Sequence, residues 1–462
     1  MAARSLDTNI DTIIHELQIR VDLHKLQQKF PQKYPFLLAS SASGSRLSRY
    51  DILFALPGEQ LVLEKLHKLS GPCSHKNKGF LDSLDSWWKS ERTIETDIHL
   101  PFIGGWFLFL GYELAAEIEP TLHITPDSIL PTAFAVRCQA AIIHDHKHDS
   151  FYVICENEQN KNLKEILLDA ANTCKDNEGN GTLVKKNTTK PVTSEERPET
   201  FLYAVQRAKD YIAAGDIFQA NLSRRWSLKV DTKLCSDAIY VNLCKSNPAP
   251  FAGLAYWKNT AIVSSSPERL LSVRNRIIST RPIAGTRPRS IDPQKDTVLS
   301  AELISHPKER AEHIMLIDLE RNDLGRVCKA GTVEVDEMMV VESYAHVHHI
   351  VSNVRGLLHE NVTPGQTISA VFPGGTITGC PKVRCMEIIA ELEQAPRGAY
   401  TGSFGYLNRD GSLDLNILIR TIVVHGNRID LRAGSGIVAD SDPQAELDET
   451  RAKAKGMTQA LI

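Results

Sequence analysis

The sequence lacks several features that mark specialised classes of protein. Its nine cysteines include no Cys-x-x-Cys pair, which argues against a disulfide scaffold and favours free, reduced thiols. A net charge of −3 gives no basic excess for nucleic-acid binding. The most apolar run, residues 101–114, is shorter than the roughly 20 apolar residues of a membrane helix. The first residues show no apolar stretch typical of a secretory signal. We therefore expect a cytoplasmic protein that binds neither membranes nor nucleic acid.

The chain is long enough for a large core, with 462 residues of which 42% are hydrophobic. Residues 174–199 are polar and nearly free of large apolar side chains, which predicts a linker or mobile loop. Before it, residues 1–173 contain short apolar runs separated by turn signals, a pattern typical of antiparallel strands. After it, residues 200–462 alternate between strand and helix patterns, which predicts a region of α/β or α+β class.

Periodicity in this second region predicts individual elements. Helices are expected at 199–214, 300–324, 381–393 and 443–461. Strands are expected at 254–257, 261–265, 347–354, 400–408, 415–425 and 428–433.

Residues 281–289, Arg-Pro-Ile-Ala-Gly-Thr-Arg-Pro-Arg, are the most unusual stretch. Proline and glycine disfavour an ordinary helix or central strand, so we predict a shaped loop with Ala284 at its centre. The fixed positive charge of its arginines suits an anionic ligand. The alternative is a solvated basic turn.

Two Glu-x-x-Glu pairs lie on separate predicted helices: Glu309 with Glu312, and Glu446 with Glu449. Residues three apart share one helix face, so each pair presents two carboxylates in one direction. A single such pair is ordinarily a solvated face. Four converging carboxylates would need a cation, and oxygen-only ligands favour Mg²⁺.

Arg420 lies in an apolar run that predicts a buried strand. A buried guanidinium needs an anionic partner, which is either an internal carboxylate or the carboxylate of a ligand. Gly434 and Gly436 follow soon after and would allow backbone N–H groups to approach that carboxylate. This Gly-x-Gly lacks the further residues of a dinucleotide-binding fingerprint.

Two further residues are candidates for acid–base chemistry. Glu268 is expected at a strand-to-turn junction, where burial would make it a general acid and exposure would make it an ordinary surface residue. Strand alternation places His349 beside Val347 and Val351, as a core residue or as an acid or base, with His346 and His348 on the other face. This division disfavours a zinc site.

Residues 373–382, Pro-Gly-Gly-Thr-Ile-Thr-Gly-Cys-Pro-Lys, open a predicted helix. Their spacing does not match a Walker loop. A helix N-terminus that receives an anion remains plausible, and we take Lys382 as a candidate substrate-binding residue.

These segments together resemble the chorismate-utilising enzymes, which include anthranilate synthase component I, aminodeoxychorismate synthase component I and the isochorismate synthases. The resemblance covers residues 200–460 in the order of the family, and a weaker match extends through Arg49-Tyr-Asp-Ile-Leu-Phe-Ala and Gly104-Gly-Trp. The motifs that carry it are Asp216-Ile-Phe-Gln-Ala-Asn-Leu-Ser, Ser266-Pro-Glu-Arg, Pro282-Ile-Ala-Gly-Thr-Arg-Pro-Arg, Glu309-Arg-Ala-Glu-His, Asp318-Leu-Glu-Arg-Asn-Asp-Leu-Gly, Pro373-Gly-Gly-Thr-Ile-Thr-Gly-Cys-Pro-Lys and Ala433-Gly-Ser-Gly-Ile-Val.

The resemblance implies an interlocked fold of antiparallel sheets packed together with helices outside, and chorismate as substrate. It also assigns roles to single residues. Glu312 and Glu449 would bind Mg²⁺ with support from Glu309 and Glu446, and the ion would hold the ring carboxylate. The enolpyruvyl carboxylate would be held by Arg420, Tyr400, Gly434 and Gly436. His349 and Thr376 would lie beside the ring, and Glu268 would assist departure of the C4 hydroxyl.

The subgroup depends on a few positions. Isochorismate synthases carry a lysine where this chain has Gln219, so the resemblance favours an aminating enzyme supplied with ammonia by a glutamine amidotransferase partner. Ala284 is typical of anthranilate synthases, whereas aminodeoxychorismate synthases usually have a nucleophilic lysine there. Leu37-Leu-Ala-Ser, Asn247-Pro-Ala-Pro-Phe and Arg49-Tyr-Asp-Ile-Leu-Phe-Ala resemble the aminodeoxychorismate branch. We therefore favour amination at C4, with anthranilate synthase as the alternative.

Overall fold

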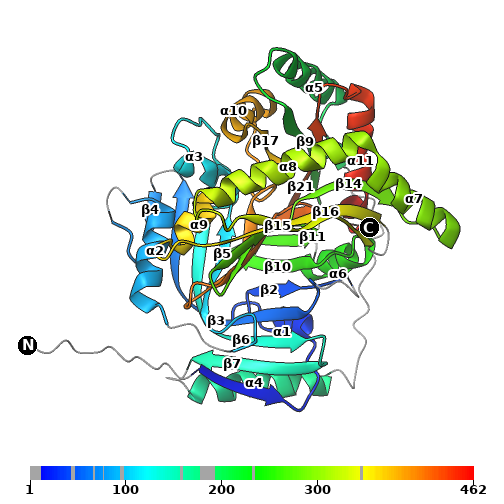
Figure 1. Ribbon diagram of the computed structural model, residues 1–462. Coiled ribbons are helices and arrows are strands. Elements are labelled where there is room, and N and C mark those ends of the chain that lie inside the picture. The colour runs from blue at the N-terminus through cyan, green and yellow to red at the C-terminus, as the bar shows by residue number, and fades with distance from the viewer. Residues whose placement is uncertain are drawn as a thin grey trace, which may run out of the picture.

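The computed structural model describes residues 12–42, 47–65, 68–75, 78–93, 98–156, 160–176, 193–230, 235–343 and 347–461. Its strands form one antiparallel hydrogen-bonded network, with helices on the outside (Figure 1). The predicted fold class of packed antiparallel sheets with external helices is therefore confirmed. Among the described residues, no helix is both long enough and apolar enough to cross a membrane.

The strands are β1 Thr12–Leu17, β2 Phe36–Ala39, β3 Tyr50–Lys65, β4 Lys68–Ser70, β5 Gly105–Leu110, β6 Ala133–Asp145, β7 Ser150–Glu156, β8 Thr193–Glu195, β9 Gln219–Lys229, β10 Phe251–Trp257, β11 Thr260–Ser266, β12 Arg269–Arg274, β13 Ile277–Thr280, β14 Ile283–Pro288, β15 Glu334–Ser343, β16 Val347–Leu357, β17 Gly379–Cys380, β18 Ser403–Asn408, β19 Leu413–Asn416, β20 Thr421–His425 and β21 Arg428–Ile437.

The helices are α1 Leu23–Lys29, α2 Phe80–Glu91, α3 Ala115–Ile118, α4 Asn160–Asp176, α5 Pro198–Ala213, α6 Ser236–Ser246, α7 Pro293–Ser305, α8 Pro307–Gly325, α9 Pro364–Val371, α10 Lys382–Glu393 and α11 Pro443–Gln459, with short 3₁₀ turns η1 Tyr112–Leu114 and η2 Gly375–Ile377.

Strands from the N-terminal region of the sequence pair with strands from the C-terminal region, so the two regions do not form separate sheets. β2 pairs with β10, and β5 pairs with β18. Aromatic rings pack across the same junction: Phe36 stacks on Phe107 with ring centroids 4.0 Å apart, and Phe107 lies 6.0 Å from Phe404. The predicted division at 174–199 therefore marks two stretches of sequence within one strand network. Residues 177–192 of that segment lie outside the described residues, while its flanks belong to α4, β8 and α5.

Two predicted elements are each interrupted in the structure. The helix expected at 300–324 is two helices, α7 and α8, which meet at His306 because Pro307 begins a new first turn. The strand expected at 415–425 is β19 and β20 with a break between them. In that break, the backbone of Leu418 bonds with Thr401 and Gly402 instead of with a neighbouring strand. Arg420 lies at the end of the break with φ 53°, so the prediction that it lies within a strand is wrong.

The predicted loop at 281–289 is also wrong in form. Most of it is β14, which pairs with β16 and contains a bulge between Ala284 and Thr286. The bulge accommodates Gly285, whose φ of +68° favours glycine, while Pro282 precedes the strand and Pro288 ends it. Its arginines bind internal carboxylates rather than remaining available to a ligand: Arg281 binds Glu337 and Glu342, Arg287 binds Glu309, and Arg289 binds Asp296.

Candidate active site

Two neighbouring strands, β9 and β21, provide the floor of the candidate site. They pair along their length, with Gly434 opposite Ser223 and Gly436 opposite Asn221. A Cβ atom at Gly434 would lie 2.5 Å from the Tyr400 hydroxyl oxygen, and one at Gly436 would lie 2.4 Å from Gln219 Nε2. Both distances are too short for a side chain, so the backbone is left bare where polar side chains converge.

Gln219 connects this floor to α8. Its Nε2 donates a hydrogen bond of 3.0 Å to Glu312 Oε1, and that carboxylate oxygen would lie 3.6 Å from a Cβ at Gly436. The structure therefore brings together three residues that the sequence singled out in separate motifs.

Arg420 enters the site from the break before β20. Its side chain is half-buried, and among the described residues no carboxylate lies close enough to form an ion pair with it. Burial lowers the pKa of Arg420, while Tyr400, Glu268 and Glu449 oppose the shift. A guanidinium remains protonated at neutral pH even so. The part of the chain that the structure describes therefore does not form the internal salt bridge that the sequence left open, and the arrangement suits the carboxylate of a ligand.

Glu268 follows β11 and is buried, with 6% of its surface exposed. Burial raises the pKa of its carboxyl to about 7, and the neighbouring Thr376 and Arg420 oppose that rise. A carboxyl group with this pKa is partly protonated at neutral pH, which is the state that a general acid needs.

His349 lies on β16, and its Nδ1 is 2.9 Å from Thr286 Oγ1 of β14. Burial lowers the pKa of His349 to about 4, so the imidazole is neutral at pH 7. His348 points to the other face, yet it is also buried and bonds to Asp296 and Ser343. His346 lies outside the described residues.

The four glutamates do not converge as closely as the sequence suggested. Among the described residues, no three of their carboxylates lie within 4.8 Å of one another. Each has its own neighbour: Arg287 binds Glu309, Gln219 binds Glu312, Ser435 and Ser441 bind Glu446, and Lys453 binds Glu449. Like charges separate when each finds a local donor. Glu309 and Glu446 are therefore each engaged by side chains of the protein.

Two predicted residues have surroundings that differ from those expected. Lys382 Nζ lies 2.5 Å from Asp323 Oδ2 and 2.9 Å from the Val371 carbonyl oxygen, contacts that give no support for binding substrate. Ala284 is buried in β14 opposite Ile350, and its methyl group offers no nucleophile.

Two residues that sequence analysis missed belong to the same site. Asn221 Oδ1 is buried without a hydrogen-bond partner, and it would lie 2.7 Å from a Cβ at Gly434. Lys453 Nζ lies 2.5 Å from Glu449 Oε1 and 3.0 Å from the Gly434 carbonyl oxygen. Both were detectable: Asn221 is two residues beyond Gln219 on one strand face, and Lys453 is one helical turn beyond Glu449.

A buried ion network holds Tyr400 in place. Glu393 accepts hydrogen bonds from Arg397 and Arg432, at 2.6 and 2.7 Å. The Arg397 guanidinium lies 5.6 Å from the centre of the Tyr400 ring. The arginines hold the pKa of Glu393 below its usual range despite burial. The network therefore holds the Tyr400 side chain in position beside Gly434.

Known proteins share the sequence pattern and the fold of this chain. A family model described as chorismate binding enzyme matches residues 49–459. The chain belongs to the chorismate-binding enzymes. It is 45% identical over 367 residues to an anthranilate synthase component I-like protein of Synechocystis sp., covering 79% of this chain and 74% of that relative. It is 40% identical over 387 residues to aminodeoxychorismate synthase component 1 of Bacillus subtilis, covering 82% of each.

The solved structures give the same picture for this chorismate-binding enzyme. The crystal structure of anthranilate synthase component I from Streptococcus pneumoniae superimposes with a TM-score of 0.77 at 33% identity, covering 90% of this chain and 93% of that one. The fold expected from the family resemblance is therefore confirmed.

The donors present fit the magnesium ion that the family resemblance implies. Glu312 and Glu449 offer oxygen ligands, which suit Mg²⁺. The absence of a Cβ at Gly436 leaves room beside Glu312, because that atom would lie 3.6 Å from the carboxylate oxygen and would collide with Gln219. Glu312 and Glu449 stay the residues that the family resemblance would assign to the metal.

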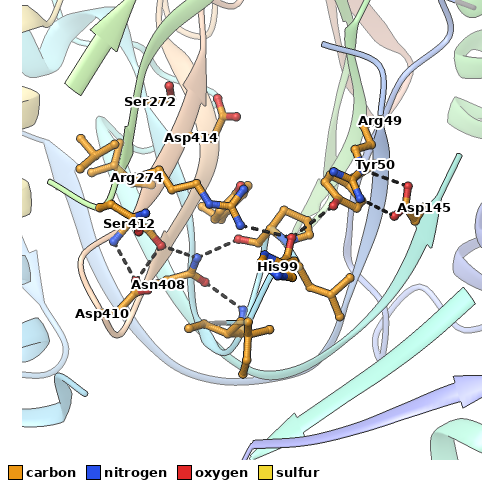
Figure 2. Close-up of a pocket in the computed structure, with 18 of the residues that line it drawn as sticks. Arg49, Tyr50, His99, Asp145, Ser272, Arg274, Asn408, Asp410, Ser412 and Asp414 are labelled. Carbon is orange, nitrogen blue, oxygen red and sulfur yellow. Dashed lines mark hydrogen bonds and ion pairs between the residues drawn. The ribbon is translucent and has the colours of Figure 1, made fainter. Parts of the chain in front are cut away.

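A large cavity lies apart from this site. It has a volume of about 910 Å³, and none of its described lining residues is among the candidates above. Figure 2 shows Arg49 paired with Asp145 on one side and Arg274 directed at the backbone of His99 on the other. The arginines beside this cavity are bonded within the protein.

Proposed function

We propose that the protein aminates chorismate at C4 to give 4-amino-4-deoxychorismate, with ammonia supplied by a glutamine amidotransferase partner. The observation that carries the chemistry is the placement of Glu268, a buried carboxyl with a pKa of about 7, next to a half-buried Arg420 with which no carboxylate of the described ranges forms an ion pair. One group can donate a proton to a leaving hydroxyl, and the other can hold the anion from which it leaves.

The binding step follows from the charge of the substrate, which carries two carboxylates. Arg420 supplies a guanidinium for one of them, and the bare backbone of Gly434 and Gly436 permits close approach. Mg²⁺ held by Glu312 and Glu449 would neutralise the second carboxylate. Because no carboxylate of the described residues pairs with Arg420, binding exchanges water around the guanidinium for a carboxylate without first breaking an ion pair.

The departure of the C4 hydroxyl needs a proton. Glu268 in its protonated form donates that proton as the C4–O bond breaks, and the hydroxyl leaves as water. A nucleophile adds at C2, and the ring double bond shifts to displace the hydroxyl. Ammonia then adds at C4, and the group at C2 leaves with its electron pair. The overall balance is chorismate plus ammonia giving 4-amino-4-deoxychorismate plus water.

Ala284 decides which nucleophile can add at C2. Its methyl group cannot attack the ring, so ammonia or water must do so. Neutral His349 lies on the strand opposite β14 and can accept a proton from that incoming molecule, because its pKa of about 4 leaves it unprotonated at pH 7.

Gln219 supports amination over hydroxylation. An amide cannot take a proton from water as a lysine amine can, and its Nε2 already donates to Glu312. Water is then not activated at this position, and ammonia is the better nucleophile.

The choice of C4 over C2 rests on a second part of the molecule. Leu38 and Ala39 line a cavity of about 370 Å³ together with Phe251 and Phe404. Ala39 provides no carboxylate at the place where the family resemblance expects a glutamate in anthranilate synthases. The similarity to aminodeoxychorismate synthase component 1 of Bacillus subtilis supports the same choice.

Anthranilate synthase is the alternative, because Ala284 is the residue expected in that branch and because relatives with that name are similar over most of the chain. In that case ammonia would remain at C2 and pyruvate would be eliminated.

A product assay tests the proposal. The protein is incubated with chorismate, Mg²⁺ and ammonium, with and without a lyase that converts aminodeoxychorismate to 4-aminobenzoate. We expect 4-aminobenzoate only when the lyase is present. Fluorescent anthranilate formed without the lyase would refute amination at C4 and establish the alternative. The variant Glu312→Ala serves as a control, since it should abolish either activity.

A further inference from the structure

A second group of metal-ligating side chains lies where β3 and β6 run side by side. Asp51 of β3 is paired across the strands with His144 of β6. His146 follows directly after β6, and its backbone N–H bonds to the carbonyl of Arg49. One ligand atom from each of Asp51, His144 and His146 lies within 4.8 Å of the others. Within the described part of the chain, no other trio of histidine, cysteine or acidic side chains meets this distance.

The contacts of Asp51 direct one oxygen to the histidines. Its Oδ1 accepts a hydrogen bond of 2.8 Å from the backbone N–H of Ser40. Its Oδ2 lies 2.9 Å from His146 Nε2 and 3.9 Å from His144 Nδ1. The carboxylate is thus oriented by the backbone, with its second oxygen directed at the two histidines.

The rings are oriented as well. His144 stacks on Phe151 with centroids 4.1 Å apart and an angle of 3° between the planes. Its outer nitrogen, Nε2, lies 3.4 Å from Asp149 Oδ1. A carboxylate at the far nitrogen fixes the tautomer of a metal-bound histidine and strengthens its inner nitrogen as a ligand.

We propose that Asp51, His144 and His146 bind a divalent transition metal such as Zn²⁺. Two imidazole nitrogens and one carboxylate oxygen suit zinc, cobalt or nickel and do not suit Mg²⁺, which prefers oxygen alone. The site is therefore chemically distinct from the glutamates of the active site.

The geometry needs only a small adjustment to bind such an ion. Zinc bonds of about 2.0–2.2 Å in a tetrahedral site place ligand atoms roughly 3.3 Å apart. The present separations of 2.9 and 3.9 Å lie on either side of that value. The His146 side chain is 37% exposed, so it can turn slightly, and water can reach the remaining position.

The site would join two parts of the N-terminal region. Asp51 lies inside the strand pair, and His146 lies on the turn that leads into β7. Arg49 and Asp145, which flank these residues in sequence, line the cavity of Figure 2. A bound ion would therefore fix the end of β6 at the wall of that cavity.

Calorimetric titration of the whole protein with Zn²⁺ tests the proposal, with excess Mg²⁺ present to occupy the glutamates. We expect one zinc ion per chain at this site. The variant His146→Ala should weaken this binding roughly 100-fold or more, because a ligand is lost. Replacing zinc with Co²⁺ should give the visible absorption of a nitrogen-ligated, low-coordinate ion in the parent and not in the variant.

His148→Ala is the matched control. This histidine is exposed on the same turn and bonds to Asp145, but it lies outside the trio. It should leave zinc affinity within about threefold of the parent. Asp51→Asn, which retains the shape and the contact with Ser40, should weaken binding as His146→Ala does. Equal affinity in the parent and in His146→Ala, or equal loss in His148→Ala, would overturn the proposal.

Discussion

Glu268 and His349 are both buried, and their pKa values shift in opposite directions, each toward the neutral form. Burial raises the pKa of the Glu268 carboxyl to about 7 and lowers that of the His349 imidazole to about 4. At pH 7 the site therefore contains a partly protonated acid and an unprotonated base. Such a pair can donate one proton and accept another without a net change of charge.

The protonation of Glu268 predicts the pH dependence of turnover. A general acid must carry its proton, so kcat should fall as pH rises through about 7, approaching tenfold per pH unit well above it. Glu268→Gln should lower kcat by ~10²–10⁴-fold. Steady-state kinetics between pH 5.5 and 9 would check both effects. A variant that retained the alkaline decline would assign it to another group.

Replacing Glu268 with a neutral residue is also expected to stabilise the folded protein. The folded pKa of about 7 lies above the ordinary value of 4.5, so the charged form is disfavoured only in the folded protein. The resulting loss in the free energy of unfolding is small below pH 4.5 and grows until pH exceeds about 7. Glu268→Gln should therefore raise the free energy of unfolding by ~1–3 kcal/mol at pH 8 and by much less at pH 5. Thermal or urea unfolding at the two pH values measures the difference, and an equal effect at both would contradict it.

Among elements, β21 contributes to the site through the side chains it lacks. A methyl group at Gly436 would meet the end of the flexible Gln219 side chain, at 2.4 Å, and no backbone atom is among its nearest neighbours. Gly436→Ala should therefore fold but separate Gln219 from Glu312. We expect KM for chorismate or the requirement for Mg²⁺ to rise about tenfold or more, an effect of ~1.4 kcal/mol. Gly325→Ala is the control, because nothing lies within 4 Å of its added Cβ.

The sequence predicted elements well where their pattern is local. The amphipathic α5 packs Phe201, Val205 and Ala208 into the core as expected. The sequence-based predictions failed where a contact between residues distant in sequence determines the backbone conformation. Arg420 leaves the expected strand because Leu418 bonds to the turn at 401–402. The arginines of β14 bind Glu337, Glu342, Glu309 and Asp296, and no local pattern indicates that these partners would be near.

At the scale of the site, the sequence identified most of the candidate residues but not how each is neutralised. Gln219, Glu312 and Gly436, which the sequence singled out in separate motifs, come together in the structure. The separation of the four carboxylates was not foreseen, because Arg287 and Ser435, which are distant in sequence, reach Glu309 and Glu446 only in the folded chain. Lys382 resembled a ligand-binding residue by its position at a helix start, but Asp323 on α8 binds it.

For the whole molecule, the pairing of β2 with β10 and of β5 with β18 makes the two halves of the sequence interdependent. Separately produced, residues 193–462 would expose the edges of β10 and β18 and the apolar surface beneath them. We expect this fragment to be insoluble or unfolded alone, and residues 1–176 to recover it when both are produced together. Circular dichroism and size-exclusion chromatography of the fragments would test this. A cooperative unfolding transition from residues 193–462 alone would contradict it.

The separation of β14 from the floor of the site has a consequence for how such enzymes diverge. In the proposed mechanism, β9 and β21 carry residues that bind the substrate, whereas Ala284 lies on β14, which pairs with β16, and its identity determines whether the protein itself can attack the ring. A substitution on β14 could therefore alter the reaction while the residues proposed to bind the substrate on β9 and β21 stay the same. A single substitution at position 284 can therefore change the product without changing the residues proposed to bind the substrate. Related enzymes can then diverge in the reaction they catalyse while each intermediate form still binds the substrate.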